Sequence, residues 1–170
     1  MKSIFTSQRL GCIASLFAGV ALTLTVTPPW IAPVLAEEQQ ETIAWKLLEL
    51  QDSEKRWIQV DLTNQRLTAW EGGEPVYLVT VSTGKEVTPT LTGTFNIQSK
   101  RPIDRMRGED YDVPDVPYAM YYDRGYAIHG AYWHNDFGTP VSHGCINMAV
   151  NHAEWLFDWA SEGTPIVIHQ

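Results

Sequence analysis

The stretch Ile128-His129-Gly130, followed after a loop by Ser142-His143-Gly144-Cys145-Ile146-Asn147, decides how this sequence is interpreted. A cysteine is a good nucleophile as its thiolate, and a nearby histidine can take the thiol proton. His129 stands at the end of a predicted strand, so the loop that follows can return the chain and place Cys145 within hydrogen-bond reach of the imidazole. The pattern therefore predicts a cysteine acyl-transfer site.

The glycines of this stretch strengthen that interpretation. Gly144 carries no side chain, so the backbone amides of His143, Gly144 and Cys145 can converge on a developing oxyanion, where each donor lowers a barrier by roughly 3 kcal/mol. The carbonyl of Gly130 can hold the His129 imidazole in the tautomer that faces the sulfur, a role often given to a carboxylate. We therefore expect catalysis from Cys145, His129 and Gly130, without an acidic third member.

The amino-terminal residues have the layout of a secretory signal peptide. Lys2 and Arg9 precede an uncharged apolar run over residues 10–26, and prolines then lead to Val34-Leu35-Ala36. We predict a signal peptide over residues 1–36, cleaved after Ala36, with an uncleaved membrane anchor as the alternative. The destination is then the periplasm or the cell wall.

Charge and cysteine content narrow the possible partners. Without residues 1–36 the chain keeps ten basic and twenty acidic side chains, which disfavours nucleic acid and anionic membrane surfaces. Cys145 is then the single cysteine and cannot form an intramolecular disulfide. A buried apolar cysteine or an intermolecular bridge is the alternative to a nucleophile. We expect no cofactor and no metal, and a monomeric chain.

Short segments of alternating or β-branched residues predict a mainly β domain of 57–170, built as a β-sandwich or as mixed sheets. Strands are expected at 57–62, 66–70, 76–81, 94–98, 118–121, 126–128 and 166–169. Residues 37–56 are charged and glutamine-rich, with Ile43, Leu47 and Leu50 at helical spacing, so they are expected to form a linker or a short helix.

One C-terminal helix is expected to pack behind the cysteine segment, with Asn151 as its amino-terminal cap and Gly163 as its stop. The longest stretch without a strand pattern, residues 100–117, contains three prolines and three arginines. It is expected to be an irregular loop, either a lid over the site or a solvated insertion.

The motifs resemble those of the L,D-transpeptidase catalytic domain family (YkuD-type), in which a strand ending in His-Gly precedes Ser/Thr-His-Gly-Cys, an apolar residue and Arg or Asn. His129-Gly130 and residues 142–147 fill every fixed position. Ser82-Thr83-Gly84 and the Thr-Pro-containing segment at 88–95 resemble upstream family segments. The resemblance extends from Trp57 to His169.

This resemblance implies an enzyme that acts on peptidoglycan stem tetrapeptides. Cys145 attacks the carbonyl of the third residue, releases D-Ala and passes the acyl group to an amine, which gives a 3→3 crosslink. Water as the acceptor gives L,D-carboxypeptidase activity instead. The resemblance also implies oxyanion and substrate contacts from a further group of residues: Ser142, His143, Gly144 and Asn147. Trp133 stands where many family members have a smaller polar residue; it is expected to line the substrate groove, and packing of this loop aromatic onto the core is the alternative.

Two other classes fit parts of the sequence. A zinc hydrolase could draw ligands from His129, His134, Asp136, His143 and Cys145, but the set lacks the His-x-x-x-His or Cys-x-x-Cys spacing that usually presets zinc geometry. A non-catalytic module that binds the cell wall fits the export signal and the acidic charge, but it leaves the two His-Gly motifs unexplained.

Overall fold

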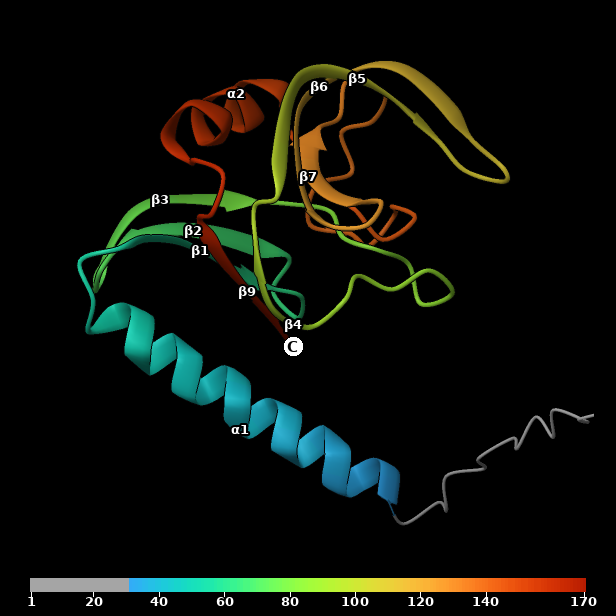
Figure 1. The fold of residues 1–170 in the computed structure, drawn as a ribbon. Helices are drawn as coiled ribbons and strands as arrows, with labels where there is room; N and C mark the ends of the chain where they lie inside the picture. The colour runs from blue at the N-terminus through green and yellow to red at the C-terminus, as the bar shows by residue number, and fades with distance from the viewer. Residues whose placement is uncertain (1–30) are drawn as a thin grey trace, which may run out of the picture.

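The computed structural model describes residues 31–170, which form two β-sheets and two helices (Figure 1). The elements follow one another as α1 Ile31–Gln51, β1 Arg56–Asp61, β2 Arg66–Glu71, β3 Glu74–Thr80, β4 Gly93–Asn96, β5 Ser99–Arg107, β6 Asp112–Asp123, β7 Tyr126–Gly130, β8 Ile146–Met148, α2 Val150–Trp159 and β9 Pro165–His169.

Both sheets are mixed. The five-stranded sheet has the order β3-β2-β1-β9-β4, and the four-stranded sheet has the order β5-β6-β7-β8. β1 pairs in parallel with β9, and β7 pairs in parallel with β8, while the remaining pairs are antiparallel. The predicted fold class, mainly β with two sheets and a C-terminal helix behind the cysteine segment, is confirmed.

The main core lies between the two sheets and α2. Every second residue along much of the strands points into this core, and α2 contributes Ala153 and Leu156. Each large aliphatic side chain that is fully buried contributes about 1.5–3 kcal/mol to the free energy of unfolding. Among the fully buried members are Ile58, Val60, Leu67, Met120, Ile128, Ile146, Met148 and Ile166. Ile128 and Ile146 flank the motif residues, so the core holds β7 and β8 firmly beneath the site.

The start of α2 differs from the sequence prediction. The helix begins at Val150, its N-cap is Ala149, and no side chain caps it. Asn151 was predicted to be the cap but lies within the first turn, because the Ala149 carbonyl already accepts from the amides of His152 and Ala153. The prediction placed the boundary too late.

The end of α2 is also not made by glycine. The helix ends at Trp159, where the ammonium group of Lys100 on β5 donates to the carbonyls of Phe157 and Ala160. A cation at a helix C-terminus satisfies unpaired carbonyls and opposes the helix dipole. Gly163, the predicted stop, lies in the following turn at a φ of 89°.

Helix α1 packs on the outer face of the five-stranded sheet, away from α2 (Figure 1). Ile43, Leu47 and Leu50 pack in a cluster with Trp57 and Val167, so the C-terminal half of α1 is attached to the sheet. The predicted signal peptide lies almost wholly outside the described residues, and the cleavage point predicted after Ala36 falls within α1. Within residues 31–170, no helix has the length and apolar character needed to cross a membrane.

The segment expected to be an irregular loop is instead a long β-hairpin. β5 and β6 pair from Ser99 with Tyr121 to Arg107 with Asp112, and a short turn joins them. β5 is an edge strand, where a proline such as Pro102 is tolerated because one side of the strand needs no ladder bonds. The prolines and charges that suggested a loop therefore belong to an exposed edge.

Candidate active site

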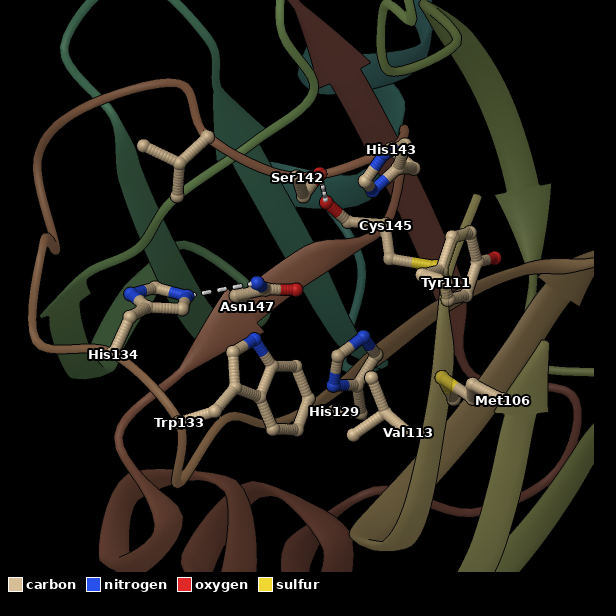
Figure 2. Close-up of a pocket in the computed structure, with 11 residues that line it drawn as sticks. Met106, Tyr111, Val113, His129, Trp133, His134, Ser142, His143, Cys145 and Asn147 are labelled. Carbon is tan, nitrogen blue, oxygen red and sulfur yellow. Dashed lines mark hydrogen bonds between the residues drawn. The ribbon is translucent and has the colours of Figure 1, made fainter. Parts of the chain in front are cut away.

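Strand register brings the two halves of the motif together. β7 and β8 are parallel neighbours, and His129 is paired with Asn147. Side chains two residues apart on a strand share a face, so Cys145, just before β8, points to the same side as Asn147. Figure 2 shows Cys145 and Asn147 on one side of the space that His129 faces from the other. Parallel pairing thus places thiol and imidazole on one surface.

These side chains line a cavity of about 250 Å³. Its floor is the β7–β8 face, and its walls come from the β5–β6 hairpin and from the loop between β7 and β8 (Figure 2). The lining residues are Met106, Tyr111, Val113, His129, Trp133, His134, Val141, Ser142, His143, Cys145 and Asn147.

His129 is held in one tautomer. Its Nδ1 lies 3.0 Å from the carbonyl oxygen of Gly130. A carbonyl can only accept, so Nδ1 carries the hydrogen and Nε2 keeps a free lone pair. His129 is buried, and burial, assisted by His134, lowers its pKa to about 4. At neutral pH the imidazole is therefore uncharged and able to accept a proton.

Cys145 is held as a thiol. Burial raises the pKa of Cys145, and its Sγ lies 3.8 Å from the carbonyl oxygen of Gly125. Within the part of the chain that the structure describes, no hydrogen bond joins this sulfur to His129. Both pKa shifts favour the neutral forms, so the resting pair is thiol and imidazole and not thiolate and imidazolium.

The hydroxyl of Ser142 fixes the loop that carries Cys145. Ser142 Oγ accepts from the amide of Gly144 and donates to the carbonyl of Cys145. The amide of Gly144, which the sequence suggested as an oxyanion donor, is therefore occupied in this structure. Gly144 adopts a φ of 112°, and a Cβ there would lie 2.6 Å from the Tyr126 ring, so no other residue fits without displacement.

A second segment holds this loop from the other side. The hydroxyl of Thr90 donates to the carbonyl of Gly144 and accepts from the amide of Gly84. A Cβ at Gly84 would lie 2.1 Å from the Thr88 carbonyl and 2.9 Å from the Gly144 Cα. This close approach explains the glycine in the Ser-Thr-Gly segment. It also shows that the upstream motif supports the cysteine loop.

The whole of this arrangement lies within a region that matches a known family. Residues 55–168 match the model of the YkuD family, the L,D-transpeptidase catalytic domain. The chain belongs to this family. The resemblance found in the motifs is thus confirmed over two thirds of the sequence.

Individual relatives and solved structures agree. L,D-transpeptidase 2 of Mycobacterium tuberculosis (strain CDC 1551 / Oshkosh) is 31% identical over 57% of this chain and 27% of its own length. The catalytic domain of the Enterococcus faecium L,D-transpeptidase is 30% identical, with a TM-score of 0.62 over 69% of this chain and 98% of that domain. L,D-transpeptidase LdtMt1, solved in complex with imipenem, is 29% identical, with a TM-score of 0.63 over 67% of this chain and 58% of its own. This chain thus spans about a quarter of the mycobacterial relative.

The hairpin contributes site residues that the sequence did not reveal. Tyr111, beside the β5–β6 turn, packs on His143 with ring centroids 4.7 Å apart. Asp110 lies 3.1 Å from Nε2 of the same histidine. Tyr111, Met106 and Val113 form one wall of the cavity. The available signal for a strand here was the β-branched and aromatic content of residues 113–122, with Val113, Val116 and three tyrosines.

The other wall is aromatic. Trp133 lines the cavity, and its ring centroid lies 5.7 Å from that of His129. Tyr132 packs edge-on against Trp133 and donates to the Pro114 carbonyl of β6. Trp133 is 40% exposed. It therefore lies in the cavity wall and is partly open to solvent, and its contact with a substrate stays a prediction.

The zinc set considered from the sequence is not assembled. Among residues 31–170, no three His, Cys, Asp or Glu side chains converge in a way that could hold a metal ion. His134 instead bonds to Asn147, and His143 contacts Asp110.

Burial of neutral His129 predicts a loss of stability in acid. Its pKa of about 4, against 6.5 for an ordinary histidine, means that between these pH values the unfolded chain binds a proton that the folded chain does not. Stability is therefore fully kept above pH 6.5, and the free energy of unfolding falls by about 3 kcal/mol as the pH drops to 4. Denaturant unfolding at pH 7 and pH 4 measures this fall in the free energy of unfolding. In His129→Gln the fall should be smaller by about 3 kcal/mol, because the glutamine does not titrate. Equal falls in the two proteins would contradict the prediction.

Proposed function

We propose that this chain is an exported L,D-transpeptidase that acts on peptidoglycan stem tetrapeptides. The observation that carries the proposal is the placement of Cys145 and a neutral, carbonyl-oriented His129 on one face of two parallel strands, lining one cavity. Family membership supports the substrate class, and the predicted signal peptide supports action in the periplasm or cell wall.

The first half-reaction begins with a turn of the Cys145 side chain from the Gly125 carbonyl toward His129. His129 Nε2 takes the thiol proton while the sulfur attacks the carbonyl carbon of the third stem residue. The tetrahedral intermediate then collapses. The C–N bond to D-Ala breaks, His129 returns the proton to the departing amine, and a thioester remains on Cys145.

The second half-reaction transfers the acyl group. The side-chain amine of a second stem attacks the thioester carbonyl, His129 takes a proton from that amine, and the sulfur leaves and regains the proton. The product is a 3→3 amide. Since Ser142 occupies the Gly144 amide, we assign oxyanion stabilisation to the amides of His143 and Cys145.

The cavity walls supply the binding surface. Tyr111 and Trp133 flank the reacting groups from opposite sides and offer apolar faces to the aliphatic part of the third residue. The acidic charge of the chain without residues 1–36 does not repel an amine acceptor. We propose that the described domain needs no cofactor or metal for this chemistry.

The test is mass spectrometry of the full chain incubated with disaccharide-tetrapeptide. The expected result is release of D-Ala, a transient acyl adduct on Cys145 and tripeptide-linked dimers. Monomeric tripeptide without dimers would replace the transpeptidase proposal by an L,D-carboxypeptidase. Absence of both adduct and turnover, while the thiol titrates as free, would favour the wall-binding module. Imipenem is the second probe, because a structural relative was solved in complex with it, and a covalent mass gain on Cys145 is expected.

A further inference from the structure

A second cavity, of about 380 Å³, lies at the end of the four-stranded sheet where β5 begins and β6 turns into β7. Its charged lining consists of three arginines and one aspartate: Arg101, Arg105, Arg124 and Asp104. We call this cavity the arginine pocket. Its lining carries more positive than negative charge, whereas the whole chain is acidic, with a net charge of −8. An anion is therefore the ligand that this pocket favours.

Tyr121 and the β6–β7 turn connect the arginine pocket with Cys145. Tyr121 lines the pocket and packs against the same buried cluster as Cys145. In the turn, Arg124 precedes Gly125, whose carbonyl oxygen lies 3.8 Å from the Cys145 sulfur. A molecule that reacts at the sulfur therefore has the arginine pocket beside it, on the far side of Tyr121.

The arginines are held in place but keep N–H groups for a ligand. Arg105 uses Nε and Nη2 to bind both oxygens of Asp112. Arg101 lies 3.2 Å from Asp104 through Nη1, and its guanidinium carbon lies 5.7 Å from the ring centroid of Tyr121. A guanidinium has five N–H donors in one plane, so each of these groups has donors left. The ligand that suits them is a planar carboxylate, which accepts two parallel N–H bonds.

The acidic groups near the pocket do not close it to an anion. The oxygens of Asp104 accept from the Tyr121 hydroxyl and from the Arg105 amide, at 2.8 and 2.9 Å, and its side chain is 18% exposed. Arg124 pairs with its neighbour Asp123, and the arginine side chain is 83% exposed. Exposed ion pairs contribute little to stability, so a ligand carboxylate can replace Asp123 as the partner of Arg124.

We propose that the arginine pocket binds a carboxylate of the donor stem peptide while the third residue of that peptide reacts at Cys145. This inference rests on the proposed function, because it takes the stem peptide as the ligand. A tetrapeptide carries one carboxylate at the end of its D-Ala residue and can carry others along its length. The bound carboxylate keeps its charge throughout the reaction, so these contacts are expected to lower KM and to leave kcat little changed.

The backbone of Arg124 allows a variant that is expected to fold. Its φ of 41° is a left-handed value, which glycine adopts more readily than a residue with a side chain. Arg124→Gly therefore removes the guanidinium and relieves the backbone. Arg101→Gln removes a second guanidinium and keeps a polar side chain. Arg107→Gln is the matched control, because Arg107 is an exposed arginine of β5 that pairs with Asp112 and lies outside the pocket lining.

The test measures turnover of disaccharide-tetrapeptide by the full chain and by these three variants. Arg101→Gln and Arg124→Gly are each expected to raise KM about tenfold with kcat within about twofold of wild type. Arg107→Gln should change neither constant. An unchanged KM in both pocket variants, or an equal rise of KM in Arg107→Gln, would overturn the inference and leave the transpeptidase proposal intact.

Binding of the same peptide to Cys145→Ala, measured by calorimetry, separates the pocket from the chemistry. Adding Arg124→Gly to this protein should weaken binding about tenfold. If the wild type has no turnover but this loss of binding is seen, the proposed function fails and the pocket assignment stands. If the peptide does not bind to Cys145→Ala at all, the pocket assignment fails as well.

Amidated peptides identify the carboxylate. If the pocket holds the terminal carboxylate, a peptide that ends in D-Ala amide should bind about tenfold more weakly to Cys145→Ala, and Arg124→Gly should cause no further loss. If the loss from Arg124→Gly persists with that amide, an internal carboxylate is the ligand, and its amidation should remove the difference. A difference that survives both amidations would overturn the inference.

Discussion

Replacing Cys145 with alanine is expected to abolish acyl-enzyme formation and to lower turnover of disaccharide-tetrapeptide by roughly a thousandfold or more. The alanine has no atom that can form the thioester, and no other cysteine lies among residues 31–170. Intact-protein mass spectrometry detects the adduct, and chromatography of the products measures D-Ala release.

Cys145→Ser is the matched control because it keeps a nucleophilic atom at the same position. Its hydroxyl is much harder to deprotonate than a thiol, so residual acylation, slower than in wild type, is expected. Cys145 is only partly exposed and packs beside the cluster that contains Met106 and Val116. Because a substitution here can also disturb packing, the Tm of each variant must match that of the wild type within a few degrees. An acyl adduct on a folded alanine variant would contradict the assignment of the nucleophile.

Replacing His129 with glutamine is expected to lower kcat/KM by about 10²–10⁴-fold. The resting thiol is neutral, since burial raises the pKa of Cys145, so acylation depends on a base that takes its proton. Glutamine retains a polar group near the Gly130 carbonyl but has no basic nitrogen. Single-turnover acylation with the tetrapeptide measures the loss directly.

The pH dependence of the same reaction separates this role from a structural one. With the pKa of His129 at about 4, the imidazole of the wild-type protein stays unprotonated well below pH 6.5 and can still act as the base. The acylation rate should therefore decline in acid only near pH 4. His129→Gln should lack that decline while unfolding normally at pH 7. A variant that retains activity within tenfold of wild type would exclude His129 as the base.

Local sequence was sufficient for the features that short-range chemistry controls. The strands at β1, β2 and β3 follow from short segments of alternating or β-branched residues, and the helix α2 follows from its apolar spacing. The Cys145 and His129 motif is specific because an acyl-transfer site needs a nucleophile, a base and residues without side-chain bulk close together.

Contacts between distant residues decided the rest. The β5–β6 hairpin is stabilised by pairing along its length and not by a local pattern, so its prolines and charges suggested a loop. α2 ends where Lys100 of another strand reaches its carbonyls, which no local residue indicates.

The position of Asn147 likewise depends on Ser82, which is far from it in the sequence and pairs with its backbone amide and carbonyl. The sequence by itself determined which chemical groups are available and most of the elements that carry them. The tertiary structure alone decided their protonation, their orientation and the walls around them, because burial and hydrogen bonding between remote segments arise only when the chain is folded.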